Sequence, residues 1–568
     1  MEIEKVGIKG FRNYLSAAIN FNKSTLIVGA NDGGKTNLIH ALRLLLDKSL
    51  SELDLEPIES DFHFQPDGTQ CESICIDIHF KEIKEEAALS VLKGNVGEDQ
   101  KCVLRYNAHR ADLSFSVYAG PSLNDLEEIS SRFYLKYINL RYVKSRRDLD
   151  KFINTEKKHL LKLAQEDRTG AEFSEDKRQL SKIEKGLNVI NSRVRKLHYV
   201  KGATGSVNTE LSKLSYNLAS YSVHLDSGAI ETQQFIDNLK LGASTSGSKI
   251  SLGGDGRNNQ ILLALWKAKS EREFDPESEV VFYCIEEPEA HLHPHQQRKL
   301  ADYLISELPG QTFITSHSPQ ITARYSPDSI VHIKVKSGSS YAASNGCSDC
   351  IDTAWDNLGY RMSILPAEAF FAASVLLVEG PSELLFYTEL AKELDFDLDF
   401  FNTSILSVDG VQFEVYTKIL DAMEIPWVIR TDNDISDITV KNVAYKNLAG
   451  INRCLSLLGL EKLPHSDHGT THEMLYEAGV WGEVSEQINE KGVFLSKIDL
   501  EHDLADELQD EILAYTKKAA VVDAVAYLQG KKAIRMREFL ASCRGRLGKI
   551  QNGEIAKPLL YCIAKAMG

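Results

Sequence analysis

Acidic side chains stand at the ends of two apolar stretches in the C-terminal half of the chain. The stretch 374–378 reads as a buried strand that runs into one acid, turns through Gly380 and enters a helix with a second acid in its first turn. The stretch 425–430 reads as another strand and ends in two acids that point the same way on an extended segment. Sites in open α/β sheets form at the carboxyl ends of strands. Four carboxylates are therefore expected to meet and to bind Mg²⁺ or Mn²⁺: Glu379, Glu383, Asp432 and Asp434.

A third acidic segment follows the apolar residues 493–495. Its acids, Asp499, Glu501 and Asp503, alternate with other residues, so all three would share one face of a strand. This spacing predicts the second half of a metal cluster. The alternative is an acidic loop ahead of a helix at 505–514, and the motif alone leaves it open.

The N-terminal part carries the most specific motif, GANDGGKT at residues 29–36. It follows a strand predicted at 25–29 and precedes a helix predicted at 37–46, which is the context that a phosphate-binding P-loop requires. Glycines let backbone N–H groups turn toward phosphate oxygens, and the helix N-terminus adds partial positive charge. The lysine is expected to reach the β and γ phosphates of ATP, and the threonine to hold Mg²⁺. The predicted nucleotide-binding residues of this loop are Gly29, Asn31, Gly34, Lys35, Thr36 and Asn37.

Three further motifs follow in the order of an ATPase head. A Ser/Gly-rich segment at 242–256 by itself reads as a linker, acids follow a strand predicted at 280–285, and a Thr-Ser-His segment follows one at 311–314. With the P-loop, this order resembles the ABC-type ATPases, in the branch that includes structural-maintenance and recombination-repair ATPases. The resemblance implies that the Ser/Gly-rich signature caps the nucleotide of a partner subunit, that the acids manage Mg²⁺ and the attacking water, and that the histidine senses γ-phosphate. The residues concerned are Ser251, Gly253, Gly254, Glu286, Glu287 and His317.

The chain departs from that ATPase pattern in two places. Glu286 stands where the family has an aspartate before the catalytic glutamate, and the signature reads SLGGDG in place of LSGGQ. ATP binding is still expected, whereas its turnover is expected to be slow.

Behind the ATPase region, EGPSE and TDND, each after an apolar strand, resemble the Toprim domain of topoisomerases, primases and some nucleases. The predicted fold is α/β: an ABC-type P-loop ATPase head with a helical dimerisation insert, followed by a C-terminal Toprim domain. The head is expected at 1–145 and 241–345, the insert at 146–240 and the Toprim domain at 346–568. The charged insert reads either as a solvated arm or as an element that pairs subunits and offers DNA a basic stripe, and we favour pairing.

The composition excludes several classes of protein. A chain of 568 residues is too long for one core, and 43% hydrophobic with 26% charged residues is typical of a globular protein with no membrane partner. The net charge of −16 would repel nucleic acid, so DNA contact needs a local basic patch, for which the run 531–549 is the best candidate. Nine scattered cysteines and a start without an apolar signal core predict a cytoplasmic protein with reduced thiols. Zinc at Cys347 and Cys350, or a metal in the loop 464–472, is not favoured because companion ligands are missing.

An ATPase region followed by a Toprim region in one chain is similar to the OLD (overcoming lysogenization defect) family of nucleases. Within that family, VEGPSE, RTDNDI, GINRCLSLLG, LSKIDLEHDL and YLQGKK resemble the nuclease subunits of the Gabija antiphage system. The resemblance implies catalytic roles for the acids of all three segments. It adds a downstream lysine, for which Lys532 is preferred over its neighbour Lys531.

The same resemblance implies two-metal phosphodiester hydrolysis. One Mg²⁺ or Mn²⁺, held by Glu379, Asp432 and Asp434, would activate water. The second, held by Glu383 with acids of the third segment, would stabilise the leaving 3′ oxygen while the lysine offsets developing charge. Further implications are double-stranded DNA as substrate, self-association into a homodimer or homotetramer, a UvrD-like helicase partner, and cleavage restrained by ATP.

Two other functions compete with this reading. A recombination- or repair-type ABC ATPase clamp would bind DNA without cutting it, but the intact set of carboxylates disfavours that role. A topoisomerase needs a strand-breaking tyrosine in a separate DNA-gate domain, for which the residues after Glu379 leave little room, and nothing suggests the zinc module of a primase. The sequence favours a nucleotide-regulated, Mg²⁺- or Mn²⁺-dependent DNA endonuclease of bacterial antiphage defence.

Overall fold

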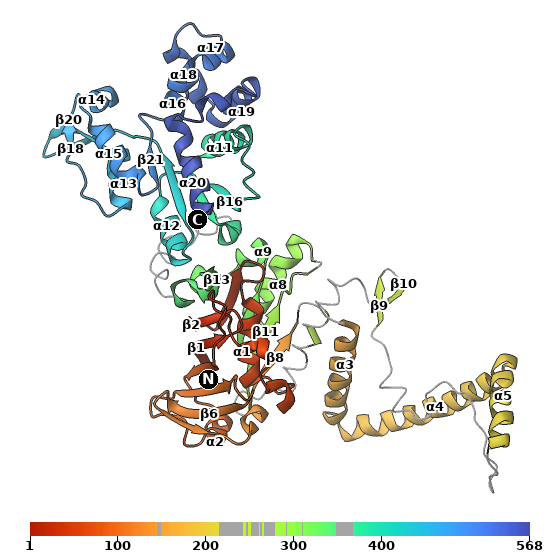
Figure 1. Cartoon of the computed structure of the whole chain (residues 1–568). Coiled ribbons are helices and arrows are strands. Elements are labelled where there is room, and N and C mark those ends of the chain that lie inside the picture. Colours follow the sequence, from red (N-terminus) through yellow and green to blue (C-terminus); the bar gives the residue numbers. More distant parts are fainter. Residues whose placement is uncertain are drawn as a thin grey trace. The chain divides into compact units, whose positions relative to one another are not determined.

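The computed structural model describes most of the chain (Figure 1). The described residues are 1–144, 149–214, 242–245, 248–251, 261, 264–265, 268, 279–290, 292–308, 310–347 and 367–567. Their contacts divide the chain into two compact units. One unit comprises residues 1–143, 277–289 and 294–568, and the other comprises 144–276 and 290–293.

The first unit begins with a six-stranded antiparallel sheet in the order β2-β1-β4-β5-β6-β7. Alternation along its strands buries one face, as Ile3, Val6 and Ile8 show for the first strand. From the sequence, residues 71–80 and 102–118 are predicted to form antiparallel strands of the ATPase head, and β4, β5 and β6 lie there. The strands are β1 (Glu2–Phe11), β2 (Tyr14–Asn20), β4 (Ser73–Lys81), β5 (Cys102–His109), β6 (Phe115–Ser122) and β7 (Asp125–Glu128), and α2 (Glu86–Val91) follows β4.

A second six-stranded sheet, in the order β14-β13-β3-β12-β11-β8, positions the P-loop. All its pairs are parallel except β13 with β14, and β3 lies between β12 and β13. Strands covered on both faces read as continuous apolar runs, and every residue of β11 is buried. The strands are β3 (Ser24–Gly29), β8 (Ile138–Val143), β11 (Val280–Glu286), β12 (Gln311–Thr315), β13 (Ile330–Lys336) and β14 (Ser339–Ala342). The helices are α1 (Lys35–Leu46), α8 (Pro294–Ser306) and α9 (Pro319–Thr322).

The second unit contains three helices and one hairpin among its described residues (Figure 1). The longest helix, α4, begins with a capping box in which Thr169 and Glu172 satisfy one another's backbone N–H groups. Most of its side chains are exposed. The elements are α3 (Leu149–Glu166), α4 (Gly170–Arg195), α5 (His198–Leu214), β9 (Gly242–Thr245) and β10 (Ser248–Ser251).

The C-terminal part of the first unit is built on a four-stranded parallel sheet, β16-β15-β17-β21. All five residues of β15 are buried, as its apolar run predicts. Helix α20 packs against this strand, and Ser374 Oγ donates a hydrogen bond to Cys562 O at 2.9 Å. The strands are β15 (Ser374–Val378), β16 (Thr403–Ser407), β17 (Trp427–Thr431) and β21 (Val493–Leu495). The helices around them are α11 (Pro381–Glu393), α12 (Phe413–Ala422), α13 (Ala449–Leu457), α15 (Val480–Asn489), α16 (Leu500–Glu507) and α20 (Lys557–Met567).

Two smaller groups of elements complete this part. A three-stranded antiparallel sheet follows the second acidic segment, and helices α17, α18 and α19 lie between α16 and α20 in the chain. The helix predicted at 505–514 is in fact two helices, α16 and α17, of which the first begins at Leu500. The bounds are β18 (Ser436–Val440), β19 (Val443–Asn447), β20 (Ser466–Asp467), α14 (His472–Glu477), α17 (Gln509–Thr516), α18 (Val521–Gln529) and α19 (Lys532–Ser542). Across the described part of the chain, no helix is long and apolar enough to span a lipid bilayer.

Candidate active site

Acids from the first two segments meet at the carboxyl edge of the parallel sheet. Glu379 directly follows β15, and Glu383 lies in the first turn of α11, with Gly380 at the N-cap and Pro381 at the first helical position. Strand β17 pairs in parallel with β15 up to the register of Val378 with Arg430, so both strands end at one edge. The loop that carries the next two acids begins there.

Glu379 is joined directly to the second acidic segment. Its Oε1 accepts a hydrogen bond from the backbone N–H of Asp432 at 2.8 Å and another from the hydroxyl of Thr431. Burial and the nearby charge of Asp432 raise the pKa of Glu379, and these hydrogen bonds partly oppose that rise. Two segments about fifty positions apart in the chain thus form one local structure, as the sequence predicted.

A buried arginine holds three of the acids together. Arg430, on β17, is only 2% exposed, and its Nη1 donates to Asp432 Oδ1 at 2.9 Å and lies 3.6 Å from Glu383 Oε1. Its Nη2 donates to Asp503 Oδ2 at 3.0 Å. Burial alone would lower the pKa of Arg430, but these carboxylates raise it well above its ordinary value. Sequence reasoning missed this residue, although a charge inside the apolar stretch IPWVIR was a signal that it has buried partners.

A second arginine, Arg453 on α13, bridges the acids on the other side. Its Nη2 donates to Asp434 Oδ2 at 2.6 Å and to the backbone carbonyl of Asp432 at 3.0 Å. Its Nη1 donates to Glu379 Oε1 at 3.3 Å. Among the interactions described, the ion pair with Arg453 is the only one that joins the side chain of Asp434 to the other acids. The side chain of Asp434 is 53% exposed. This arginine was also missed, because its distance in sequence gave no sign of the contact.

Two further residues fix the loop between the strands. Gly450 lies so close to it that an added Cβ would stand 2.6 Å from Asn433 Cα, and its N–H donates to Asp434 O at 2.9 Å. A ring nitrogen of His472 is 2.5 Å from Asn433 O. The sequence treated His472 as an ordinary loop residue, whereas it contacts the backbone between the two aspartates.

The third acidic segment does not form the predicted strand. Asp499 is the N-cap of α16, and Glu501 and Asp503 lie in its first turn, so the three acids do not share one face. The prediction was wrong because the side chain of Asp499 accepts the N–H of His502, a capping bond that starts the helix at Leu500. The alternative of an acidic segment ahead of a helix was closer, although the helix begins earlier than expected.

The three acids of this segment face different environments. His502 and Gln529 donate to Asp499, and these bonds outweigh its burial and hold its pKa at about 2. Asp503 accepts from Arg430 and, at 3.2 Å, from the backbone N–H of Lys497. Glu501 is 1% exposed, and neither of its carboxylate oxygens has a hydrogen-bond partner among the described residues. Burial raises the pKa of Glu501 to about 7.

Lys532 is the first residue of α19 and reaches the same cluster. Its Nζ lies 3.9 Å from Asp432 Oδ2, and the side chain is half exposed. Burial would lower the pKa of Lys532, but Glu501, Asp432 and other acids raise it. The neighbouring Lys531 is the N-cap of the helix, so the preferred lysine is the one beside the acids. Elsewhere in the basic run, Lys549 pairs with Glu511 at 2.5 Å and Arg535 lies over the ring of Tyr527.

The acids supply the oxygen ligands that a divalent cation prefers, but their side chains are not gathered around one ligand position. Oxygen donors suit Mg²⁺ or Mn²⁺, and Glu501 supplies two buried oxygens that accept no hydrogen bond from the described residues. Within the described ranges, no three His, Cys, Asp or Glu side chains are gathered closely enough to hold a metal ion. The two arginines pair with three of the acids, Glu379, Asp432 and Asp434.

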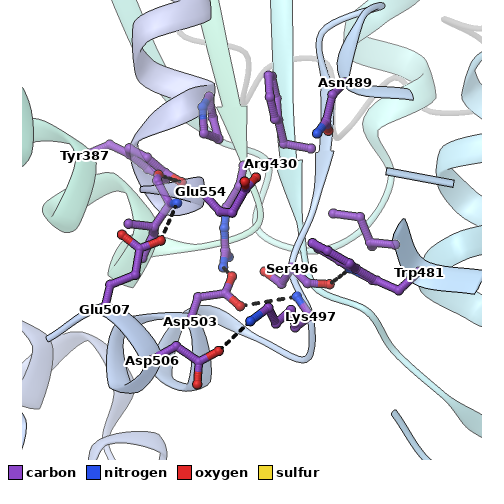
Figure 2. Close-up of a pocket in the computed structure, with 14 residues that line it drawn as sticks. Tyr387, Arg430, Trp481, Asn489, Ser496, Lys497, Asp503, Asp506, Glu507 and Glu554 are labelled. Atoms are coloured by element: carbon purple, nitrogen blue, oxygen red, sulfur yellow. Dashed lines mark hydrogen bonds and ion pairs between the residues drawn. The ribbon is translucent and has the colours of Figure 1, made fainter. Parts of the chain in front are cut away.

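A small cavity of about 70 Å³ lies beside Arg430, and Figure 2 shows the residues that line it. Lys497 lies on its wall, where its Nζ pairs with Asp506 at 2.8 Å and its backbone N–H donates to Asp503. Trp481 Nε1 donates to Ser496 O at 2.9 Å on the same wall. These contacts fix the support of the Arg430–Asp503 pair, and the cavity is too small for a nucleotide.

The P-loop has the predicted strand, loop and helix. Gly34 adopts φ 107°, where an added Cβ would stand 2.3 Å from the Asn13 side chain, and α1 begins at Lys35. Lys35 Nζ donates to the carbonyls of Gly29 at 2.9 Å and Ala30 at 2.8 Å. Burial lowers the pKa of Lys35, and nearby acids partly offset this. Thr36 is exposed in the first turn of α1, and Asn37 accepts from Arg12 at 3.0 Å.

The acids and the histidine predicted for the nucleotide lie near this lysine. Glu286 ends β11 and accepts from Tyr142 at 3.0 Å, and Glu287 Oε1 lies 3.7 Å from His317 Nε2. The charges of Glu287, Glu286 and Glu289 all raise the pKa of Lys35, so these acids lie close to the P-loop lysine. Glu289, which sequence reasoning did not single out, accepts from Ser316 and from the His317 N–H at 2.8 Å each.

The predicted signature falls mainly outside the described residues. Ser251 is the last residue of β10, and Gly253 and Gly254 lie outside the described ranges. All three belong to the second unit, so their place at the nucleotide of a partner stays a prediction. Cys347 is buried beside Thr25, while Cys350 also lies outside the described part.

Comparison with known proteins gives two family matches. The AAA ATPase domain family matches residues 1–322, and the TOPRIM domain of overcoming lysogenization defect-like proteins matches residues 370–434. The predicted α/β fold, an ATPase head followed by a Toprim domain, is confirmed.

Three relatives are similar over most of their lengths. "Endonuclease GajA" of Bacillus cereus is 27% identical and covers 95% of each chain. "OLD nuclease" of Thermus scotoductus is 22% identical over 76% of this chain and 82% of its own. "Old nuclease" of Escherichia phage P2 is 23% identical over 76% of this chain and 77% of its own. The resemblance to OLD nucleases that the sequence motifs indicated is confirmed.

Proposed function

We propose that this chain, which belongs to the AAA ATPase domain family, is a nucleotide-regulated, Mg²⁺- or Mn²⁺-dependent DNA endonuclease of bacterial antiphage defence. The names of the relatives, an endonuclease and two nucleases, support the activity. The observation that carries the proposal is the convergence of acids from three segments around Arg430 and Glu379. An edge of a parallel sheet with that density of carboxylates suits two-metal hydrolysis.

The residues of the Toprim part divide into ligands and supports. Two bound Mg²⁺ or Mn²⁺ ions would supply an activated water and stabilise the leaving 3′ oxygen. Glu379, Asp432 and Asp434 would hold one ion, and Glu383 with Glu501 the other; Asp499, whose two oxygens accept from His502 and Gln529, would join the second ion only by releasing one of them. Lys532, beside Asp432, would offset charge that develops on the scissile phosphate. Arg430 would hold the ligands in register.

Asp503 receives a different role from the one that its sequence position suggested. Its carboxylate accepts from Arg430 and from the Lys497 N–H, so both its oxygens already have partners. We therefore assign it to the support of Arg430 rather than to the metal. Glu501, whose two oxygens have no such partners among the described residues, is the better ligand.

The ATPase head would bind ATP with Mg²⁺. Gly29, Asn31 and Gly34 would present backbone to the phosphates, with Lys35 reaching them and Thr36 holding Mg²⁺. Glu286 and Glu287 would manage the attacking water, and His317 would sense the γ-phosphate. Ser251 and Gly253 of a second subunit would complete the site, so the chain would act as a homodimer or homotetramer. ATP would restrain cleavage until its concentration falls.

The partners follow from the same assignment. Double-stranded DNA would be the substrate, the insert at 146–240 would pair subunits, and a UvrD-like helicase would act with the nuclease. The motifs that resemble Gabija nuclease subunits support this set of partners, as does the similarity to "Endonuclease GajA" over nearly the whole chain.

A plasmid-cleavage assay with Mg²⁺ or Mn²⁺, with and without ATP, tests the proposal. Glu379→Ala is expected to abolish cutting, and Glu389→Ala, an acid of α11 paired with Lys392, serves as the matched control that cuts normally. Lys35→Ala is expected to cut at the parental rate but without a response to ATP. Parental cutting by Glu379→Ala would overturn the active-site assignment.

One observation favours a second candidate, a clamp that binds DNA without cutting it. The arginines occupy the acids, and no three ligands are gathered in the described part of the chain. This function would be supported if the unaltered protein binds DNA tightly but leaves plasmid intact with either metal.

A further inference from the structure

A groove of about 900 Å³ lies on the Toprim part beside Arg453. The start of α12 and the residues just before it form one wall, and α13 forms another. The loop 462–465 closes the third side. This volume is near the upper end of the ~300–1,000 Å³ range of ligand pockets, so the groove suits a short stretch of one nucleic-acid strand rather than a duplex.

The groove adjoins the carboxylates through one shared residue. Arg453 lines the groove, and the same guanidinium binds Glu379 and Asp434. The loop that leads into α12 is tied to the same place, because the Gly410 N–H donates to Glu379 O at 3.0 Å. A strand that lies in the groove would therefore pass next to the arginine that holds the acids.

The outer wall is fixed by specific bonds. The side chain of Asn452 donates to Leu463 O at 3.1 Å and accepts from the Leu463 N–H at 2.7 Å. These two bonds hold the loop 462–465 to α13, so the groove is a built feature of the fold. Its shape does not depend on an exposed, unsupported loop.

The lining combines cations with apolar surface. Lys462 and Arg453 bring positive charge, and His465 lies near Tyr445 with ring centroids 6.4 Å apart. The one acid of the lining, Glu414, pairs with Lys418 at 2.8 Å. In a chain of net charge −16, the exposed Lys462 beside apolar groups such as Leu457 suits the phosphates and bases of a single strand, whereas Arg453 is already paired with Glu379 and Asp434.

We propose that this groove holds the nucleotides of the scissile DNA strand next to the phosphate that is cut. The inference rests on the proposed nuclease function and adds the path of the substrate. Lys462 contacts backbone phosphates, and the apolar wall on α13 contacts a base. Arg453 stands where the groove meets the acids, so this arginine and Lys532 are the two cations closest to the scissile phosphate in the assignment.

The test measures binding separately from cutting. Binding of a fluorescent single-stranded and a double-stranded oligonucleotide is followed by anisotropy in a Glu379→Ala background. Ser456→Trp fills the groove from α13 and is expected to weaken binding at least about tenfold, because the indole takes the space of the strand. Ser90→Trp, at an exposed helical serine of α2 outside the groove, is the matched control.

A second variant tests the role of charge with a substitution at an exposed residue. Lys462→Glu is expected to reduce the slope of log affinity against log salt by about one to two, because phosphate contacts set that slope. Lys441→Glu, in the turn between β18 and β19 and outside the groove, carries the same charge reversal as a control. Circular dichroism checks that the four variants are folded.

The outcomes separate the inference from the function on which it rests. Equal affinity and salt slope for the groove variants and their controls overturn the groove. The groove assignment is also overturned if AMP occupies the groove without displacing the fluorescent DNA oligonucleotide from the protein. Absence of plasmid cutting by the unaltered protein, with groove-dependent DNA binding intact, overturns the nuclease and supports the groove as a DNA site.

Discussion

The P-loop and the carboxylate cluster each contain a buried cation, but these cations come from different parts of the chain relative to the motif. In the P-loop the cation belongs to the motif itself, since Lys35 folds back onto the carbonyls of Gly29 and Ala30. In the cluster the cations come from outside the acidic motifs, Arg430 from within a strand and Arg453 from a separate helix. A local site thus carries its own counter-charge, while a dispersed site depends on the fold for it.

This difference predicts unequal sensitivity to loss of the cation. Removing Lys35 leaves two uncharged carbonyls, those of Gly29 and Ala30, without a donor, whereas removing Arg430 leaves the carboxylates of Asp432, Glu383 and Asp503 buried without a counter-charge. We expect Arg430→Met to lower the free energy of unfolding by about 3–5 kcal/mol, and Lys35→Met by less than about 1 kcal/mol. Denaturant unfolding of both variants gives the comparison.

The contrast would fail if both variants lost the same stability. A matched control is Arg537→Met, which removes an exposed arginine of α19. If it destabilises as much as the Arg430 variant, the cost reflects the substitution rather than the buried pair.

The second prediction separates the two acids of α16 that the sequence treated alike. Glu501 has two oxygens without a described partner, so Glu501→Gln is expected to weaken Mn²⁺ binding at least about tenfold. Asp503→Asn is expected to affect stability more than metal affinity, because it supports Arg430. Calorimetric titration with Mn²⁺, together with thermal unfolding, distinguishes them. A larger loss of metal affinity in the Asp503 variant would return that residue to the ligand set.

The sequence predicted what local pattern determines. Strand, loop and helix of the P-loop follow from eight consecutive residues, and the convergence of Glu379 with Asp432 follows from two apolar strands that end in acids. Parallel strands covered on both faces read as unbroken apolar runs, which made β11 and β15 recognisable.

The rest depends on contacts that no window of sequence contains. The acids of the third segment alternate with other residues, a pattern that suits a strand, but the capping bond of Asp499 begins a helix at Leu500. Arg453 and His472 reach the loop from other elements, so their roles became visible only when α13 and α14 were placed. The one sequence signal for a residue that supports the acids was a charged side chain inside the apolar strand β17, which is Arg430.

The third prediction concerns pH, and it follows from Glu501. Its folded pKa, about 7, lies above the ordinary value of 4.5, so the folded protein binds more protons than the unfolded chain between these pH values. Stability of the metal-free protein is therefore expected to fall as pH rises from about 4.5 to 7 through this group, and Mn²⁺ binding to release a proton below pH 7.

Calorimetry in two buffers of different ionisation enthalpy measures that proton. The unaltered protein is expected to release close to one more proton at pH 6 than at pH 8, and Glu501→Gln to lose this difference. The P-loop offers the contrast, since Lys35 is a cation whose pKa burial lowers, and Mg²⁺–ATP binding there should not show the same pattern. Equal proton release by the variant would assign the titration to another acid.

The smallest effect is expected at His472, which touches the backbone rather than a reacting group. Its ring nitrogen contacts Asn433 O, so His472→Ala removes one hydrogen bond from the loop between Asp432 and Asp434, at a cost of about 0.5–1.5 kcal/mol. The matched control is His468→Ala, at an exposed histidine between β20 and α14 that lies 3.5 Å from Asp437. This substitution should lower the free energy of unfolding by less than His472→Ala does. The P-loop backbone is held by hydroxyl groups instead, since Tyr14 OH donates to Gly34 O at 3.0 Å and Ser340 Oγ donates to Gly33 O at 2.8 Å. Cleavage by His472→Ala should fall several-fold and recover at higher Mn²⁺ concentration, since loss of loop order weakens metal binding rather than the chemical step. A loss that excess Mn²⁺ does not rescue would instead place His472 against the substrate.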